Sequence, residues 1–419
     1  MRAQAFGMTN KGKVRDHNED FILVRPELGL YIACDGMGGH NAGEVASQMA
    51  AETIALEIQH NFEPIKLYSK DPTVSTRETV KRIIDEAIQT ACNKIYTQGQ
   101  ANQTQQGMGT TLTLVLHCGS NAFMAHAGDA RIYLYRDHGL HPMTQDHSLV
   151  NELVQKGMIT KEQAVNHPKG NVITRAVGIQ EGVEADILHM EMIHGDILLL
   201  CSDGLTKHLT DLDLQTIFKK IPHDSLESIK LCAQQFIQTT LDRGALDNVS
   251  VVLVALDQEG ANKNNEAQAN AAKKIETLKR IPLFSELDYQ QLMKILEIIE
   301  IKSFNAEELV IHEGDKGDQM FILLQGKAQV LKYQTQINLL GPGAYFGEMG
   351  LIDDAPRSAS VKAIEKTKMI VLSKARLFQT LQSDMLMANK VYWFFLQTLS
   401  KRLRDKDKET DKDKEKEKA

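Results

Sequence analysis

The stretch from residue 30 to residue 40, LYIACDGMGGH, constrains this chain more than any other. Its apolar first half, Leu30 to Cys34, has the length and residue types of a buried β-strand. Asp35 follows directly, then three glycines within four residues, and a helical pattern from about Ala42. Glycines let a backbone approach a ligand closely, and a carboxylate is a hard oxygen ligand suited to Mg²⁺ or Mn²⁺. The stretch alone fits an ordinary glycine turn or a metal site equally well.

Acidic residues recur where other apolar strands begin or end, which favours the metal site. The other positions are the segment 15–20 (Arg-Asp-His-Asn-Glu-Asp), Asp203 after an apolar run, and Asp247 before another. Carboxylates that a fold brings together repel strongly unless cations lie between them. A two-metal centre resolves this repulsion, lowers the pKa of a bridging water and clamps an in-line displacement at phosphorus.

Composition narrows the class of protein. With 419 residues, of which 42% are hydrophobic, the chain is long enough for two or three domains with full cores. A net charge of −7 argues against a general nucleic-acid binder. No apolar run reaches membrane-spanning length and the polar N-terminus lacks a signal-peptide core, so we expect a cytoplasmic protein without a membrane partner. The five scattered cysteines are expected to be buried free thiols.

Residues 1–256 mix short β-rich runs with longer helical patterns. Strands are predicted over 21–24, 30–34, 110–116, 121–127, 131–135, 196–201 and 249–256. Helices are predicted over 42–60, 77–96, 149–156 and 226–241. Several strands follow one another without a helix between them, so we expect antiparallel sheets and an α+β fold.

The composition changes after residue 256. Residues 257–274 are polar and rich in Asn and Ala, which predicts a linker. A helix is expected from a capping-box-like start at Ser285 to Leu296, then glycine-punctuated short strands over 304–372 that suggest a β-roll. Further helices are expected over 374–381 and 388–404. The charged tail, 405–419, is expected to be a solvated helix end without a core, and we assign it no function.

The order of short motifs in residues 1–256 resembles the metal-dependent protein Ser/Thr phosphatases of type 2C, in their bacterial form. The motifs are Arg-x-x-Asn-Glu-Asp, Asp-Gly-Met-Gly-Gly-His, Gly-Asp-Ala-Arg at 128–131, Ser-Asp-Gly at 202–204 and Asp-Asn at 247–248. The segments 144–150 and 171–176 are similar to the family's flap region. The resemblance implies an α-β-β-α sandwich of two antiparallel sheets, with two metals in a cleft at one end.

The resemblance also implies roles for individual residues. Asp35 would bridge both metals and Gly36 would offer its carbonyl to one, while Asp203 and Asp247 hold the other. Glu19 and Asp20 would lie at the site directly or through water. Arg15 would grip the phosphate, since a guanidinium suits phosphate geometry.

Two of these positions keep an alternative. Asp129 corresponds to a third, weaker metal, but a turn residue is the other interpretation. His40 would donate a proton to the leaving serine oxygen, or it is an ordered residue at a helix start. Some relatives carry the histidine two residues after the aspartate, where this chain has Met37, which leaves the general acid open.

The segment 341–360 points to a second ligand site. A glycine turn, an acid, a short helical segment and an arginine followed by small residues form an anion site with a hydroxyl acceptor beside it. Residues 275–404 closely resemble cyclic-nucleotide-binding domains. By that resemblance Glu348 binds the ribose 2′-hydroxyl and Arg357 the cyclic phosphate, while Gly347, Ser358 and Ala359 line the pocket. Tyr392 and Trp393 would stack on the base, although core positions are more common for such residues.

Taken together, the sequence predicts a Mn²⁺- or Mg²⁺-dependent phosphatase acting on phosphoserine and phosphothreonine in proteins. A metal-bridging hydroxide would attack phosphorus directly, and cAMP or cGMP would regulate the enzyme through the second domain. Two alternatives stay open: a C-terminal domain that serves docking or dimerisation without ligand, and a catalytically weak N-terminal domain in a cyclic-nucleotide-dependent binding protein. The sequence leaves open the protein substrate, the choice between cAMP and cGMP, the sign of regulation and the oligomeric state.

Overall fold

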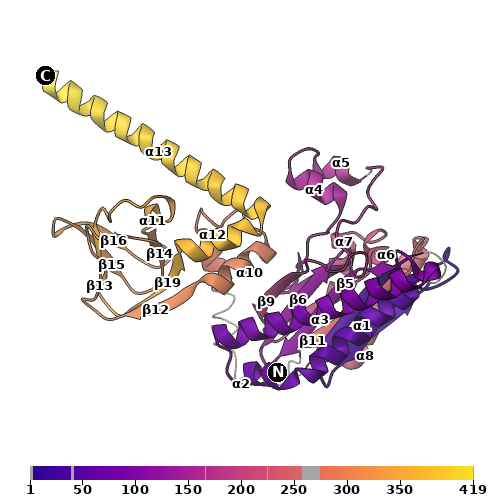
Figure 1. Ribbon diagram of the computed structural model, residues 1–419. Helices are drawn as coiled ribbons and strands as arrows, with labels where there is room; N and C mark the ends of the chain where they lie inside the picture. Colours follow the sequence, from indigo (N-terminus) through magenta and orange to yellow (C-terminus); the bar gives the residue numbers. More distant parts are fainter. Residues whose placement is uncertain (1–2, 39–41, 166, 224, 257–273, 419) are drawn as a thin grey trace. The chain divides into compact units, whose positions relative to one another are not determined.

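The computed structural model describes residues 3–38, 42–165, 167–223, 225–256 and 274–418 (Figure 1). The chain forms two compact units, residues 1–269 and 270–419. Nearly all of the predicted linker lies outside the described residues. Among the described helices, none has the length and apolar character needed to cross a membrane.

Two antiparallel sheets form the centre of the first unit. One has the order β1 (Ala3–Asn10), β11 (Val249–Leu256), β10 (Ile197–Cys201), β7 (Arg131–Arg136) and β8 (Gly139–Pro142). The other has the order β2 (Asp20–Arg25), β3 (Leu30–Met37), β5 (Leu112–Cys118), β6 (Asn121–Ala127) and β9 (Asp186–Glu191), with β4 (Gly109–Thr110) paired to β3. All seven predicted strands are present, whereas β1, β8 and β9 were not predicted.

Helices cover the outer face of each sheet, as Figure 1 shows for α1 and α3. The helices α1 (Ala42–His60), α2 (Phe62–Lys70) and α3 (Val74–Ala101) share a core with β3, β5 and β6. The helices α7 (Asp211–Lys220) and α8 (Leu226–Asp242) share another with β7, β10 and β11. This layering confirms the predicted α-β-β-α sandwich. Shorter elements connect the layers: η1 (Gln103–Gln105), α4 (Leu149–Gln155), α5 (Lys161–Val165) and α6 (Asp203–Thr206).

The second unit is a β-roll with flanking helices, as predicted. One sheet has the order β12 (Glu300–Phe304), β19 (Thr367–Ser373), β14 (Gln319–Gln325) and β17 (Tyr345–Phe346). The other has the order β13 (Leu309–Ile311), β18 (Ser360–Ala363), β15 (Ala328–Lys332) and β16 (Thr335–Leu340). The two sheets enclose one apolar core. Its helices include α10 (Tyr289–Ile298), α11 (Met349–Ile352), α12 (Lys374–Gln382) and α13 (Met385–Lys418).

The predicted helix start at Ser285 was wrong. The helix expected from Ser285 begins at Tyr289, because Asp288 is the residue that caps it. The Asp288 carboxylate accepts a hydrogen bond of 2.9 Å from the Gln291 amide, and the Gln291 side chain accepts one of 3.2 Å from the Asp288 amide. This reciprocal pair satisfies two amides that a helix start otherwise leaves unpaired.

All five cysteines are buried and free, which confirms the expectation for the thiols. Cys201 is fully buried on β10, directly before the Ser-Asp-Gly motif. The thiols therefore belong to the cores.

Candidate active site

Four aspartates lie at strand ends that the two sheets bring together. Asp20 begins β2 and pairs directly with Asp35 near the end of β3. Asp203 follows β10 and Asp247 precedes β11, and those two strands are neighbours in the other sheet. Burial, and then the charges of Asp20, Asp203 and other nearby carboxylates, raise the pKa of Asp35 well above its ordinary value. The four carboxylates therefore share one space.

Asp20 is buried and held by two serines. The hydroxyls of Ser202 and Ser250 donate hydrogen bonds of 2.8 and 2.7 Å to its Oδ2 atom. Burial raises the pKa of Asp20 to about 7, against the effect of both hydrogen bonds. Among the described residues, Oδ1 of Asp20 and Oδ1 of Asp203 are buried without a hydrogen-bond partner. Buried carboxylate oxygens that lack a donor suit a bound hard cation.

Gly36 lies where three backbone segments approach one another. A Cβ atom at Gly36 would lie 2.1 Å from the Gly43 carbonyl oxygen and 2.6 Å from that of Glu19. The Gly36 amide donates to the same Glu19 carbonyl at 3.1 Å, and the Ser47 hydroxyl donates to it at 2.6 Å. The pKa of the Glu19 carboxyl is raised, chiefly by burial. Glycine at this position thus brings the residues after Asp35 against the segment that carries Glu19.

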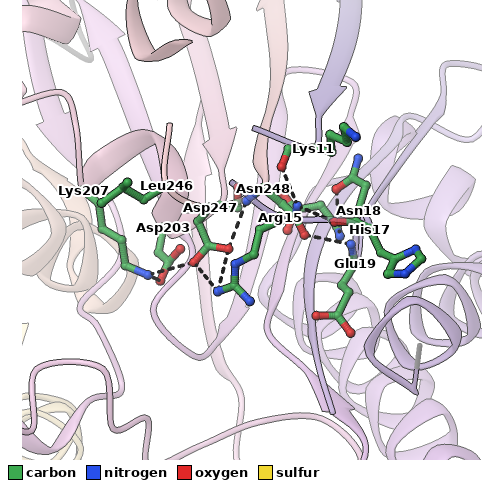
Figure 2. A network of polar contacts seen from close by, with 12 residues as sticks. Lys11, Arg15, His17, Asn18, Glu19, Asp203, Lys207, Leu246, Asp247 and Asn248 are labelled. Atoms are coloured by element: carbon green, nitrogen blue, oxygen red, sulfur yellow. Dashed lines mark hydrogen bonds and ion pairs between the residues drawn. The ribbon is translucent and has the colours of Figure 1, made fainter. Parts of the chain in front are cut away.

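Asn248 fixes the segment that carries Arg15 and Glu19, as Figure 2 shows. Its side-chain oxygen accepts a hydrogen bond of 2.8 Å from the Glu19 amide. Its side-chain nitrogen donates to the carbonyls of Lys11 and His17 at 3.0 and 2.9 Å. The start of β11 therefore sets the path of residues 11–19 around the carboxylates.

Two cations contact the carboxylates that follow β10 and precede β11 (Figure 2). The Lys207 ammonium lies 2.5 Å from Asp203 Oδ2 and 3.3 Å from Asp247 Oδ2. The Arg15 guanidinium lies 3.0 Å from Asp247 Oδ1. Arg15 is half exposed, with 51% of its side chain accessible, so it stands at the open side of the cluster.

Asp129 borders a pocket next to this cluster. The pocket has a volume of about 530 Å³, and its lining includes Asp129, Asp203, Lys207, Asn151 and Asn171. Burial, and then the charge of Asp203, raise the pKa of Asp129 to about 7. Asp129 is therefore near the other carboxylates, as its proposed role requires.

The two segments that were predicted to form the flap region, 144–150 and 171–176, pair with each other. Ser148 and Ile173 form an isolated antiparallel bridge, and the Leu149 amide donates to the Val172 carbonyl at 2.8 Å. The helices α4 and α5 lie within this loop, and α4 contributes Asn151 to the pocket. The flap thus forms one wall of the pocket beside Asp129.

His40 lies outside the described residues, together with Gly39 and Asn41. The general acid therefore stays a hypothesis from the sequence. The remaining predicted residues of the first unit are brought together around the strand ends: Arg15, Glu19, Asp20, Asp35, Gly36, Asp129, Asp203 and Asp247.

Four residues that hold the site together had no role assigned from the sequence: Ser202, Lys207, Asn248 and Ser250. The sequence did carry a signal for Ser250, because it is a polar residue inside the apolar run of β11. In the structure its side chain is fully buried. Lys207 had such a signal as well: it stands four residues after Asp203, the spacing at which helical side chains meet.

Arg357 occupies a cradle of glycines in the second unit. Its guanidinium donates to the carbonyls of Gly347 and Gln319 at 3.0 and 2.7 Å. A Cβ atom would lie 1.9 Å from Arg357 Nε if built on Gly317, and 2.8 Å from Nη1 if built on Gly347. Burial lowers the pKa of Arg357, though its carboxylate neighbours oppose this. Glycine at these positions leaves the room that the guanidinium fills.

The other predicted ligand residues lie close to Arg357 in the chain. Ser358 is exposed and Ala359 is half-buried. Glu348 stands directly before α11 and lines a pocket of about 520 Å³ with Tyr345 and Trp393.

Neither aromatic residue of α13 that the sequence singled out is a core residue. Trp393 is 63% exposed and Tyr392 is 42% exposed. The more common expectation for such residues was therefore wrong, and Trp393 faces the pocket that Glu348 lines.

Comparisons with known proteins decide the family. A family model described as protein phosphatase 2C matches residues 12–242, which is more than half of the chain. The chain belongs to the protein phosphatase 2C family. A second model, the cyclic nucleotide-binding domain, matches residues 301–384, so the second unit carries a domain of that kind.

Relatives within the protein phosphatase 2C family are similar over the first unit. Serine/threonine phosphatase stp of Listeria monocytogenes (serotype 4b, strain F2365) is 35% identical over 252 residues, 59% of this chain and 94% of the relative. Protein phosphatase PhpP of Streptococcus pneumoniae (serotype 2, strain D39) is 33% identical over 259 residues, 61% and 98% of the two chains. This chain is accordingly a protein serine/threonine phosphatase.

Solved structures agree with this family. The Mycobacterium tuberculosis phosphatase PstP/Ppp superposes with a TM-score of 0.53 at 33% identity, covering 61% of this chain and 99% of that one. The catalytic domain of PstP in complex with two manganese ions gives a TM-score of 0.51 at 32% identity, with the same coverage.

Proposed function

We propose that this chain hydrolyses phosphoserine and phosphothreonine in proteins with two divalent ions, Mn²⁺ or Mg²⁺, at the carboxylate cluster. The observation that carries the proposal is the pair of buried oxygens, Oδ1 of Asp20 and Oδ1 of Asp203, that lack a donor among the described residues. A related phosphatase, PstP, holds two manganese ions in its solved catalytic domain.

The residues that fit this role are those gathered at the strand ends. Asp35 faces both halves of the cluster, and Asp203 and Asp247 lie on the side of β10 and β11. Gly36 would supply a carbonyl, Glu19 and Asp20 would complete the acidic set, and Asp129 would hold a third, weaker ion. Six carboxylates against Arg15 and Lys207 leave an excess of negative charge for which divalent ions compensate.

Divalent ions bound here would activate a water for direct attack on phosphorus and neutralise charge as it develops. Arg15, at the open side of the cluster, would leave Asp247 and bind the phosphate oxygens in a bidentate manner. Asn248 would hold the segment of Arg15 in place, since it fixes the carbonyls and amide of residues 11–19. The flap would border the substrate beside the pocket.

Metal-dependent hydrolysis of an aryl phosphate tests the first proposal. We expect phosphate release by the full chain with Mn²⁺ and none with a chelator. Asp203→Asn should lower the rate by orders of magnitude and leave the circular dichroism spectrum unchanged, because it removes a ligand charge and no core contact. Asp242→Asn, an exposed change of the same kind at the end of α8, should have no effect. Full activity in the presence of the chelator would refute the two-metal proposal.

We also propose that a cyclic nucleotide, cAMP or cGMP, binds the second domain and regulates the phosphatase. The match to the cyclic nucleotide-binding domain and the glycine cradle around Arg357 support this proposal. Arg357 would bind the cyclic phosphate and Glu348 the ribose hydroxyl, with Gly347, Ser358 and Ala359 around them. Trp393 would stack on the base. We assign residues 1–256 to the phosphatase domain and 275–404 to the nucleotide domain.

Calorimetry on the full chain tests nucleotide binding. We expect heat of binding with cAMP or cGMP, and loss of at least ~30-fold in affinity in Arg357→Ala, because an unpaired charge would remain in a partly buried site. Glu348→Ala should lose less, since water partly replaces hydrogen bonds to a neutral hydroxyl. An Arg357→Ala variant that binds as tightly as the wild type would contradict the assignment.

A further inference from the structure

Lys207 lies at the proposed metal site, yet the proposed mechanism gives it no role. It follows α6, four residues after Asp203, and its ammonium bridges the Oδ2 atoms of Asp203 and Asp247 at 2.5 and 3.3 Å (Figure 2). These two carboxylates are the ones assigned above to a divalent ion. The lysine side chain is 39% exposed, whereas the two aspartates are 16% and 21% exposed. The ammonium thus covers the inner carboxylates from the solvent side.

The backbone of Lys207 is held by hydrogen bonds, whereas its side chain borders a pocket. The Lys207 amide donates to the Asp203 carbonyl at 2.8 Å, and the Thr206 hydroxyl donates to the same carbonyl at 3.3 Å. A lysine ammonium is a compact charge on a flexible four-carbon stem. The pocket of about 530 Å³ beside Asp129 has Lys207 in its own lining, so the side chain has room to move without a change in the backbone.

A divalent ion and the ammonium compete for the same atoms. Mg²⁺-sized ions require carboxylate oxygens at ~2.0–2.1 Å in near-octahedral geometry, which leaves no room for an ammonium between the same oxygens. Oδ2 of both aspartates contacts Lys207 and Oδ1 of Asp247 contacts Arg15, so of the oxygens of these two aspartates only Oδ1 of Asp203 lacks a partner. An ion therefore gains the Oδ2 atoms as ligands only when the lysine withdraws.

We propose that Lys207 is a built-in cation that balances Asp203 and Asp247 in the metal-free protein and must be displaced when a divalent ion binds there. The proposal rests on the proposed metal site. It gives Lys207 two effects of opposite sign. The lysine stabilises the metal-free fold, because it pairs two carboxylates that otherwise repel, and it weakens the affinity for the ion.

Calorimetric titration of the full chain with Mn²⁺ alone tests the competition. In Lys207→Met the dissociation constant for Mn²⁺ should fall at least ~10-fold, because the competing unit charge is gone. Lys207→Arg keeps the charge and should bind Mn²⁺ with an affinity close to that of the wild type. Lys219→Met, which removes an exposed lysine near the end of α7, should leave the affinity unchanged.

Equal or weaker Mn²⁺ binding in Lys207→Met would overturn the inference. Failure of the wild type and all three variants to bind Mn²⁺ would instead overturn the proposed metal site, so the two failures are distinguishable. Thermal unfolding adds a readout independent of activity. With chelator, Lys207→Met should melt at a lower temperature than the wild type, and with Mn²⁺ this difference should vanish. A variant as stable as the wild type in chelator would contradict the role of the lysine in the metal-free fold.

Acetylation of the wild-type protein provides a test that needs no variant to fold. An amine-reactive reagent followed by mass spectrometry measures how accessible each lysine is. We expect Lys207 to react faster with Mn²⁺ than with chelator, since the ion releases it, while Lys219 reacts equally in both. An unchanged rate at Lys207 in a sample that binds Mn²⁺ would show that the lysine stays in place, contrary to the inference.

Discussion

At the scale of single residues, Asp247 is the carboxylate that contacts both cations at the proposed metal site. Arg15 contacts it from one side and Lys207 from the other (Figure 2). Arg15 is half exposed, so its pair with Asp247 contributes little to stability by itself. The importance of the two cations lies in placement, because both charges stand where a phosphoryl group and its metals would enter.

Arg15→Ala should weaken substrate binding more than metal binding. The guanidinium is bonded to Asp247 without a substrate and would turn to the phosphate with one, so its loss should raise KM for a phosphothreonine peptide at least ~10-fold. The Mn²⁺ affinity should stay the same or increase, since a competing cation is removed. Steady-state kinetics and Mn²⁺ calorimetry measure the two effects. The control is Arg25→Ala, since Arg25 is the last residue of β2 and forms an exposed ion pair with Glu27. A collapse of Mn²⁺ affinity with an unchanged KM would show that the assigned role is wrong.

Gly36→Ala should disturb the metal site through the backbone. The added methyl would lie 2.1 Å from a carbonyl oxygen of α1, so the end of β3 must shift. Overpacking of this kind costs about 1–3 kcal/mol, and the shift moves Asp35. We expect weaker Mn²⁺ binding by calorimetry and a lower midpoint in urea. The control is Gly182→Ala, whose added methyl would contact only the end of the Gln89 side chain. It should change neither the Mn²⁺ affinity nor the urea midpoint appreciably. Wild-type metal affinity in Gly36→Ala would contradict the close packing.

The site residues that the sequence predicted share one property. Asp35, Asp203 and Asp247 each stand next to an apolar run, so strand, turn and ligand are contiguous in the chain. Their supports are not contiguous: the partners of Asp20 are Ser202 and Ser250, which are 182 and 230 residues away. A hydrogen bond over such a separation depends on how the sheets pack, which the local pattern does not encode.

At the scale of elements, helix caps and sheet edges explain the elements that the sequence misplaced or missed. The helix α3 begins at Val74 rather than 77, because Thr73 and Thr76 form a capping box. The strand β1 pairs with β11 over its full length, yet it was not predicted. Its residues are only half-buried, since it lies at the edge of a sheet, and its sequence therefore lacks a strong apolar run.

Asp288→Ala should destabilise the second unit by about 1 kcal/mol, the usual cost of a lost N-cap. Trp393 is the only tryptophan of the chain and lies in this unit, so its fluorescence during urea unfolding reports on this unit. Ser285→Ala, at the helix start that the sequence suggested, should change the free energy of unfolding by less than about 0.5 kcal/mol. A larger effect at Ser285 than at Asp288 would place the cap where the sequence first suggested.

The contact between α2 and β9 should make the first unit sensitive to acid. His189 on β9 is buried against Tyr68 of α2, and burial lowers its pKa to about 3. In the unfolded chain His189 takes up a proton near pH 6.5, whereas in the folded chain it does so only near pH 3. The free energy of unfolding is therefore highest above pH 6.5 and decreases as the pH falls toward 3. The loss is about 1.4 kcal/mol per pH unit while only the unfolded state is protonated.

Urea unfolding by circular dichroism between pH 7 and pH 4.5 measures this dependence. His189→Gln should flatten the curve by about that slope, because glutamine does not titrate. Asp186, whose pKa is lowered to about 2, affects stability only at lower pH and does not interfere in this window. Parallel curves for the variant and the wild type would contradict the assignment to His189.

At the scale of the whole molecule, the chain joins a phosphatase to a cyclic nucleotide-binding domain. A ligand changes the rate of the other domain only if it binds two states of the chain with different affinity. Within the second unit, Lys390 and Trp393 of α13 line the same pocket as Glu348. Nucleotide in that pocket would contact the helix directly.

The most direct test of this account is phosphate release from a phosphothreonine peptide by the full chain in saturating Mn²⁺, with and without saturating cAMP or cGMP. We expect the rate of the wild type to change at least ~5-fold with one of the nucleotides, the lower end of measured couplings between sites. Arg357→Ala should keep the nucleotide-free rate and lose the response. Equal rates in the free and nucleotide-bound wild type, with binding demonstrated by calorimetry, would contradict the coupling of the two domains.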